Sequence, residues 1–171
     1  RALIEGAVAE AAATSATRRD IAKLDDILAL MRGTAHPGGD SIAADRSFHV
    51  AVADILGNDA VTEIVSQLFD QRVNPYFKQL ARYFETPDSW RSALEEHTAI
   101  RDAIASGNGS AAASAMRSHL VASQERFSKN FGPNLSAGSA KSKRTNKSAP
   151  KRQPPLHPRI PAQKQTRRKL I

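Results

Sequence analysis

The chain has 171 residues and no cysteine, which excludes a disulfide framework, a thiolate zinc site and a cysteine nucleophile. No apolar run approaches the ~20 residues that a membrane-spanning helix needs, and the first residues lack the uninterrupted apolar core of a signal peptide. We therefore expect a single cytoplasmic domain of ordinary size with no membrane partner.

Charge is distributed unevenly along the chain. Residues 1–132 contain all 17 acidic residues and 14 of the 25 lysines and arginines, a net charge of −3, although the whole chain has a net charge of +8. Residues 133–171 contain the other eleven basic residues and no acidic one. The pattern indicates a mildly acidic domain with a basic appendage.

Abundant alanine, apolar residues at helical spacing and the rarity of proline inside these segments predict an all-α domain. Six helices are expected, over about residues 1–15, 17–31, 41–56, 59–83, 86–106 and 110–129. The last helix is predicted to end before Gly132 and Pro133. Because the connections are short, we expect the helices to pack antiparallel in a bundle.

The third helix contains an acid and an imidazole beside its apolar stripe. In the stretch DRSFHVAVADILGN, Phe48 and Val52 belong to that stripe, and Asp45 and His49 lie along its edge. Side chains at positions i and i+4 lie one above the other on a helix, so both can reach one point. A hydrogen-bonded Asp–His pair explains this pattern, and so does a share in a larger polar site.

Two arginines lie on apolar helix faces. Arg72 follows Leu68 by four residues in the fourth helix, and Arg1 shares a face with Ile4 and Val8 in the first. Such a guanidinium either extends to solvent along the apolar surface or holds an anionic ligand through paired hydrogen bonds. Arg1 and Arg72 are therefore candidate ligand-binding residues.

The fifth and sixth helices each place a histidine on the inward face. His97 shares its face with Ile100, and His119 shares its face with Met116. Each histidine alone is typical of a core side chain whose hydrogen bonds are satisfied. An unpaired buried polar group costs on the order of several kcal/mol, however, so several of them in one bundle favour convergence.

Asp45, His49, His97 and His119 together form a set of three nitrogen ligands and one oxygen ligand. Such a set suits Zn²⁺, and also Ni²⁺, Mn²⁺ or Fe²⁺. The sequence therefore predicts one divalent metal site, with a hydrogen-bonded polar core as the alternative.

Four stretches carry a resemblance to a known family. RALIEGAVAEAAA, DRSFHVAVADILGN, EEHTAIRDAIASGN and AAASAMRSHL follow one another in the order typical of the C-terminal effector-sensing domain of FadR-type regulators. These regulators are a subgroup of the GntR-type transcriptional regulators. The resemblance covers about residues 1–130, and the series is specific only when all its parts occur together.

The resemblance implies an antiparallel bundle of six or seven helices. In metal-containing members of the family, the matching positions bind one divalent metal, which here assigns Asp45, His49, His97 and His119 as the ligands. Members sense small metabolites, often organic acids, that bind beside or directly on the metal. We therefore expect a small organic-acid effector and a homodimer.

Two features depart from the family pattern, and a third matches it ambiguously. Members normally begin with a winged helix-turn-helix that binds DNA, whereas this sequence starts within the first effector-domain helix. DNA contact is therefore expected only through a missing N-terminal domain or weakly through the basic C-terminal tail. Asn108 stands where the family has an acid. Asn58 matches a family asparagine, and we interpret it as the C-cap of the third helix.

Residues 132–171 are predicted to be a disordered basic tail that follows a domain of residues 1–131. The segment is rich in proline, serine and lysine and has few large apolar residues that could offset the entropy of ordering. The tail is outside the family pattern. It either contacts DNA phosphates weakly or is a solvated segment without selected function.

The leading hypothesis is a non-enzymatic regulator domain that senses a carboxylate through its metal. A metallohydrolase on a helical bundle is the alternative, because catalytic zinc sites also keep an open coordination position. A convincing general base is missing, however, since Glu95 and Glu96 are adjacent and unlikely both to face inward. A plain helical interaction module with a polar core is the third hypothesis.

Overall fold

The computed structural model describes residues 1–34, 39–72 and 86–137. The helices in this part of the chain are α1 (Ala2–Ser15), α2 (Arg18–Gly33), α3 (Gly39–Asp54), α4 (Asp59–Arg72), α6 (Pro87–Ala105) and α7 (Gly109–Ala137). No strand occurs among the described residues, so the predicted all-α class is confirmed. None of the described helices is long and apolar enough to cross a bilayer.

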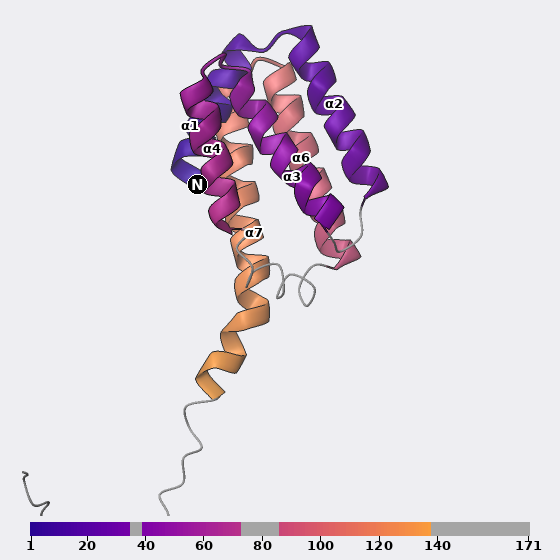
Figure 1. Cartoon of the computed structure of the whole chain (residues 1–171), viewed down its shortest axis with the longest axis vertical. Helices are drawn as coiled ribbons and strands as arrows, with labels where there is room; N and C mark the ends of the chain where they lie inside the picture. Colours follow the sequence, from indigo (N-terminus) through magenta and orange to yellow (C-terminus); the bar gives the residue numbers. More distant parts are fainter. Residues whose placement is uncertain (35–38, 73–85, 138–171) are drawn as a thin grey trace, which may run out of the picture. The chain divides into compact units, whose positions relative to one another are not determined.

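The helices pack side by side as a bundle (Figure 1). The long helix α7 packs along α1 and α6, while α3 packs against α1, α2 and α4. Helix α6 also contacts α1 and α2. As a result α3, α6 and α7, which carry the predicted metal ligands, surround one region of the interior.

Every described helix contributes to the apolar interior. The large or medium-sized core side chains, one from each helix in chain order, include Val8, Leu24, Phe48, Val65, Ile100 and Met116. All are at least nine-tenths buried. Burial of an apolar side chain of this size contributes about 1.5–3 kcal/mol to folding, so this interior can support polar groups at its centre.

Small residues bring α1 and α7 close together. Ala9 and Ala12 of α1 and Ala112 of α7 are fully buried. A Cβ on Gly109 would lie only 3.0 Å from the carbonyl oxygen of Glu10. The close approach of the two backbones allows side chains of moderate length from both helices to reach the same central region.

Two helices begin with the signals that their sequences predict. The Thr17 hydroxyl accepts a hydrogen bond from the Asp20 backbone N–H, and the Asp20 carboxylate accepts one from the Thr17 N–H. Thr86 and Ser89 form the same reciprocal arrangement before α6, with Pro87 at its first position. These capping boxes satisfy backbone donors that have no partner inside the helix.

The interpretation of Asn58 as a C-cap is wrong. Gly57 instead ends the turn after α3 with φ +62°, and the Asn58 side-chain oxygen accepts hydrogen bonds from the N–H groups of Ala60 and Val61, at 3.0 and 3.4 Å. Asn58 therefore caps the start of α4. Asn108 acts in the same way before α7, because its side-chain oxygen accepts a hydrogen bond from the N–H group three residues later.

The predicted end of the last helix is also wrong. Helix α7 continues through Gly132 and Pro133 to Ala137. A single proline removes one helical hydrogen bond and often kinks a helix without ending it. The predicted continuation of the fourth helix beyond residue 72 lies outside the described residues, as do residues 138–171. The domain boundary at residue 131 stays a prediction.

Candidate metal centre

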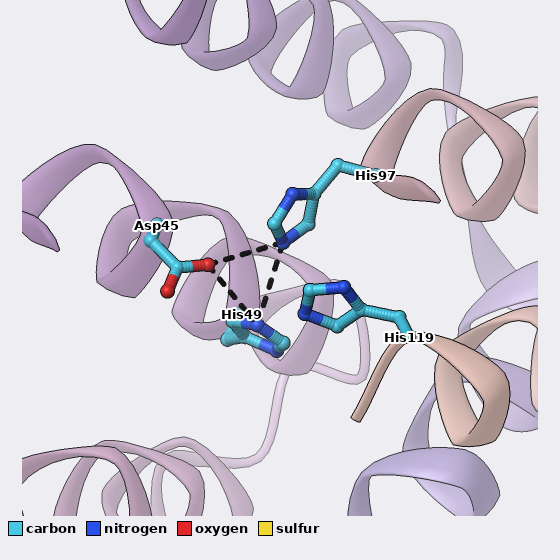
Figure 2. Close-up of side chains that lie close together, drawn as sticks. All are labelled: Asp45, His49, His97 and His119. Atoms are coloured by element: carbon cyan, nitrogen blue, oxygen red, sulfur yellow. Dashed lines mark hydrogen bonds and ion pairs between the residues drawn. The ribbon is translucent and has the colours of Figure 1, made fainter. Parts of the chain in front are cut away.

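Four polar side chains converge inside the bundle (Figure 2). Asp45 and His49 come from α3, His97 comes from α6 and His119 comes from α7. Each is at least 95% buried. Each offers one ligand atom, and these four atoms all lie within 4.8 Å of one another. The structure thus brings together the four residues that the sequence singled out.

The spacing of the facing atoms suits a single metal ion. Asp45 Oδ1 lies 3.2 Å from His97 Nε2 and 3.5 Å from His49 Nε2, and the two Nε2 atoms are 3.5 Å apart. Ligands bound tetrahedrally at about 2.1 Å from Zn²⁺ lie roughly 3.4 Å from one another. His119 Nε2 is buried and has no hydrogen-bond partner among the residues that the structure describes. A buried imidazole nitrogen of this kind is costly unless a cation or another partner uses its lone pair.

Outside this centre, His49 contacts a buried carboxylate that the sequence analysis missed. Glu5 of α1 is only 1% exposed, and its Oε2 lies 2.6 Å from His49 Nδ1. Its other oxygen accepts a hydrogen bond from Arg1 Nε at 2.6 Å. Glu5 shares the spacing of Val8 and Ala12, and this spacing could have identified it as an inward residue.

His119 has a matching arrangement on α6 and α7. Its Nδ1 lies 2.7 Å from Glu96 Oε2. Arg126 donates two hydrogen bonds to the same carboxylate, at 2.6 and 2.9 Å. Glu96 and not its neighbour Glu95 therefore points toward the site, since the Glu95 side chain is exposed. The residue spacing alone could not decide which of the two adjacent glutamates does so.

The charges inside the cluster are linked. Burial raises the pKa of Asp45, but His49 and His97 outweigh burial and hold it well below its usual value. Burial lowers the pKa of His49, but Asp45 and Glu5 outweigh burial and raise it. Burial lowers the pKa of His97 despite Asp45, and burial followed by the charge of His97 lowers the pKa of His119 to about 3. The centre therefore offers an ionised carboxylate and at least two neutral imidazoles.

The two outer glutamates remain ionised over a wide pH range. Burial raises the pKa of Glu5, but hydrogen bonds and charges of His49 and Arg1 outweigh it and lower the pKa to about 2. Burial likewise raises the pKa of Glu96, and Arg126 and His119 outweigh it and lower the pKa to about 2. Each glutamate is thus a hydrogen-bond acceptor facing the outer nitrogen of a histidine.

Aromatic rings border the polar cluster. The Phe48 ring lies edge-on to His97 with their centroids 4.5 Å apart, and Phe69 lies 5.8 Å from His49. Both phenylalanines are fully buried. These apolar neighbours keep the local dielectric low, which strengthens the attraction between a cation and its ligands.

Of the two arginines that were predicted to bind the effector, the structure describes only one with its side chain. The Arg1 guanidinium pairs with Glu5 and lies 5.0 Å from the centroid of the Phe69 ring, so its charge already has a carboxylate partner. The side chain of Arg72, at the end of α4, lies outside the described residues. A role in effector binding stays a prediction for both arginines.

Known proteins resemble the chain over its helical part. The model of the FCD domain matches residues 1–122. The Uxu operon regulator of Haemophilus influenzae is 35% identical over 121 residues, which are 70% of this chain and 46% of that protein. The Exu regulon transcriptional regulator of Escherichia coli K12 is 38% identical over 123 residues, again 70% and 46%. The HTH-type transcriptional regulator LutR of Bacillus subtilis is 29% identical over 136 residues, which are 79% of this chain and 62% of that protein.

The names of these relatives describe regulators, which agrees with the non-enzymatic regulator domain expected for this chain. The chain spans about half the length of the first two relatives. The match to the family extends over more than two thirds of the chain and includes all four converging side chains. The chain therefore belongs to the FCD family, the effector-sensing domains of GntR-type transcriptional regulators.

Proposed function

We propose that this domain binds one divalent metal ion through Asp45, His49, His97 and His119 and uses the ion to sense a small carboxylate. The observation that carries the proposal is the convergence of four buried ligand atoms. One of them, His119 Nε2, has no hydrogen-bond partner within the described part of the chain. Zn²⁺ fits the three imidazoles and one carboxylate, and Ni²⁺, Mn²⁺ or Fe²⁺ are the other candidates.

The charge of the loaded centre favours an anionic effector. A divalent ion held by three neutral imidazoles and Asp45 has a net charge of about +1. The outer pairs Arg1–Glu5 and Arg126–Glu96 are each neutral overall, so they leave this charge unchanged. When bound, the metal would supply a position at which a carboxylate oxygen binds, and Arg72 is a candidate for holding the far end of the effector.

The regulatory output is proposed to need more than this chain. The matched region is 46% of each of the first two relatives, and their names describe regulators of an operon or a regulon. We propose that the domain acts with an N-terminal DNA-binding domain, that it works as a homodimer, and that any contact between residues 132–171 and DNA is weak. Effector binding would change how the DNA-binding domains are held.

The hydrolase alternative lacks support in the second sphere of the site. The two carboxylates nearest to the ligand histidines, Glu5 and Glu96, bind the outer Nδ1 atoms and an arginine each. Neither is placed beside the inner Nε2 atoms, where a general base would act on a metal-bound water. Asp45 does face that centre, but it is itself assigned as a ligand.

Metal analysis followed by calorimetry tests the proposal. The purified protein should hold about one divalent ion per chain, and a panel of hydroxy- and dicarboxylic acids should bind only when the ion is present. Arg72→Ala should weaken effector binding and spare the metal. Equal carboxylate binding after chelation would exclude the mechanism, and steady turnover of a panel member would support the hydrolase instead.

A further inference from the structure

Two of the predicted ligand histidines, His49 and His119, each contact a glutamate that in turn contacts an arginine. From His49 the contacts run through Glu5 to Arg1, and from His119 they run through Glu96 to Arg126. The first set of contacts joins α3 and α1, and the second joins α7 and α6. In both, the carboxylate meets the Nδ1 atom of the histidine, at 2.6 and 2.7 Å.

The position of the carboxylate decides which ring nitrogen can bind a metal. A neutral imidazole has one N–H donor and one lone pair, and the partner of one nitrogen fixes the role of the other. An ionised carboxylate has only acceptors, so in the His119–Glu96 hydrogen bond Nδ1 of His119 is the donor. The 2.6 Å ion-pair contact between Glu5 and His49 favours a proton on Nδ1 of His49 in the same way. The lone pairs are then on the Nε2 atoms, which face the centre.

We propose that Glu5 and Glu96 are positioning residues that hold His49 and His119 in the Nδ1–H form, with Nε2 free to bind the metal. This inference deepens the proposed metal site and rests on it. Hydrogen bonds of this kind also fix the orientation of the ring and raise the basicity of the ligand nitrogen.

The arginines complete the arrangement. Arg1 and Arg126 each donate two hydrogen bonds to their glutamate. Such paired bonds fix the plane of the carboxylate and keep it ionised. Because each arginine also cancels the charge of its glutamate, the two positioning carboxylates orient the ligands without reducing the attraction of the centre for an anion.

Charge-removing variants with matched controls test the two glutamates. Glu96→Gln keeps the size of the side chain, but an amide can either accept from Nδ1–H or donate to Nδ1, so it no longer selects one tautomer. Glu5→Gln makes the same change beside His49. The controls are Glu95→Gln and Glu10→Gln, exposed glutamates on the same two helices.

Two readouts are needed. Imidazole ¹⁵N spectra of the metal-free protein, taken at a pH where His49 is neutral, report which ring nitrogen is protonated. Competition with a zinc chelator gives the dissociation constant for Zn²⁺. Helical circular dichroism checks that each variant is folded, and Glu96→Gln carries the test if Glu5→Gln unfolds, because the Glu96 side chain is already 24% exposed.

Each variant should disturb its own histidine. Glu96→Gln is expected to give a mixture of tautomers at His119 and Glu5→Gln a mixture at His49, with about 10- to 100-fold weaker Zn²⁺ binding in both and no change in the controls. Histidines that keep the Nδ1–H form in both variants, or Zn²⁺ binding equal to that of the unsubstituted protein, would overturn the inference. Failure of the unsubstituted protein to bind any metal would instead count against the proposed function. The tautomer spectra would still show whether Glu5 and Glu96 fix the protonated nitrogen of His49 and His119.

Discussion

Asp45 combines two properties that rarely occur together in a small helical domain. It is buried in the interior, yet hydrogen bonds and charges of His49 and His97 keep its pKa well below the usual value despite burial. An ionised carboxylate in such surroundings needs a cation close by. The nearest basic groups are the imidazoles of His49 and His97, and although burial lowers the pKa of His49, Asp45 and Glu5 outweigh burial and raise it. A metal ion would take over the same role.

At the residue scale, His97 is the most informative ligand to remove. It is the single ligand from α6 and lies between Asp45, at 3.2 Å, and His49, at 3.5 Å. We expect His97→Ala to lose most of the bound metal, because the remaining ligands no longer surround the ion. Metal content after dialysis, measured by elemental analysis, checks this expectation.

The matched control for His97→Ala is the next residue along the helix. The Thr98 hydroxyl bonds only to the Leu94 carbonyl of its own helix among the contacts described, so Thr98→Ala should keep the full metal content. Full metal occupancy in His97→Ala would remove His97 from the ligand set. Loss in both variants would indicate that the helix, and not the imidazole, is the cause.

The sequence predicted the four inward ligands because each one lies on an apolar stripe with helical spacing. The outer residues were harder to identify. Glu5 has the spacing of an inward residue, but in sequence it resembles an ordinary exposed glutamate of an alanine-rich helix. Glu96 cannot be distinguished from Glu95 unless it is known which face of the helix points to the interior. Both roles depend on a histidine from a different helix, and no pattern within one helix contains this information.

At the element scale, the ends of the helices depend on short polar contacts. The predicted helix ranges leave turns at residues 57–58 and 107–109, and Gly57 and Gly107 at these turns have positive φ in the structure. It misassigned Asn58, because asparagine after glycine suits either the end of one helix or the start of the next. Which of these applies depends on the geometry of the following residues, which one residue type does not determine.

The cap of α2 offers a stability test that is independent of the metal. In Thr17→Ala the hydroxyl that accepts the Asp20 N–H is lost, which should lower the free energy of unfolding by about 1 kcal/mol at neutral pH. Hydrogen bonds from Thr17, first its hydroxyl and then its backbone, lower the pKa of Asp20. The ionised Asp20 therefore stabilises the fold above its unfolded pKa, and this contribution is lost as the pH falls through its folded pKa.

The difference between Thr17→Ala and the unsubstituted protein should consequently shrink in acid. Urea unfolding in the presence of chelator, at neutral pH and at a pH below 3.8, measures both values. Thr14→Ala is the control, because the Thr14 hydroxyl bonds only to a carbonyl of its own helix among the contacts described and lies on the exposed side of α1. A difference that stays constant across this pH range would show that the Asp20 carboxylate takes no part in the cap.

At the scale of the whole molecule, the fold and the centre depend on each other to different degrees. The apolar core includes side chains from all the described helices. The all-α bundle follows from this periodicity, which is why the sequence was sufficient to predict it. The convergence of α3, α6 and α7 at one point depends on packing between segments far apart in the chain. The sequence indicated it through the cost of burying several polar groups singly and through the family resemblance.

The contrast between an apolar core that forms the bundle and a polar centre that binds the ion predicts how the protein responds to loss of metal. Because the apolar core does not need the ion, chelation should leave the chain folded, unlike a zinc finger, whose folding depends on its metal. The ion would nevertheless connect α3, α6 and α7 in the folded state only. A ligand that binds the folded state alone stabilises it by about 4 kcal/mol at a free concentration 1,000 times its dissociation constant. For a domain of this size such a gain raises the melting temperature by roughly 10 °C or more.

Thermal unfolding followed by circular dichroism, in chelator and at increasing free Zn²⁺, measures this stabilisation. The melting temperature should rise steadily with the logarithm of free Zn²⁺ once the site is saturated, because each tenfold increase adds about 1.4 kcal/mol. His97→Ala provides the reference, since its melting temperature should respond little to Zn²⁺. Equal melting temperatures with and without Zn²⁺ would mean that the four side chains form a hydrogen-bonded polar core and not a metal centre. Complete unfolding in chelator would show instead that the apolar interior cannot support the bundle without the ion.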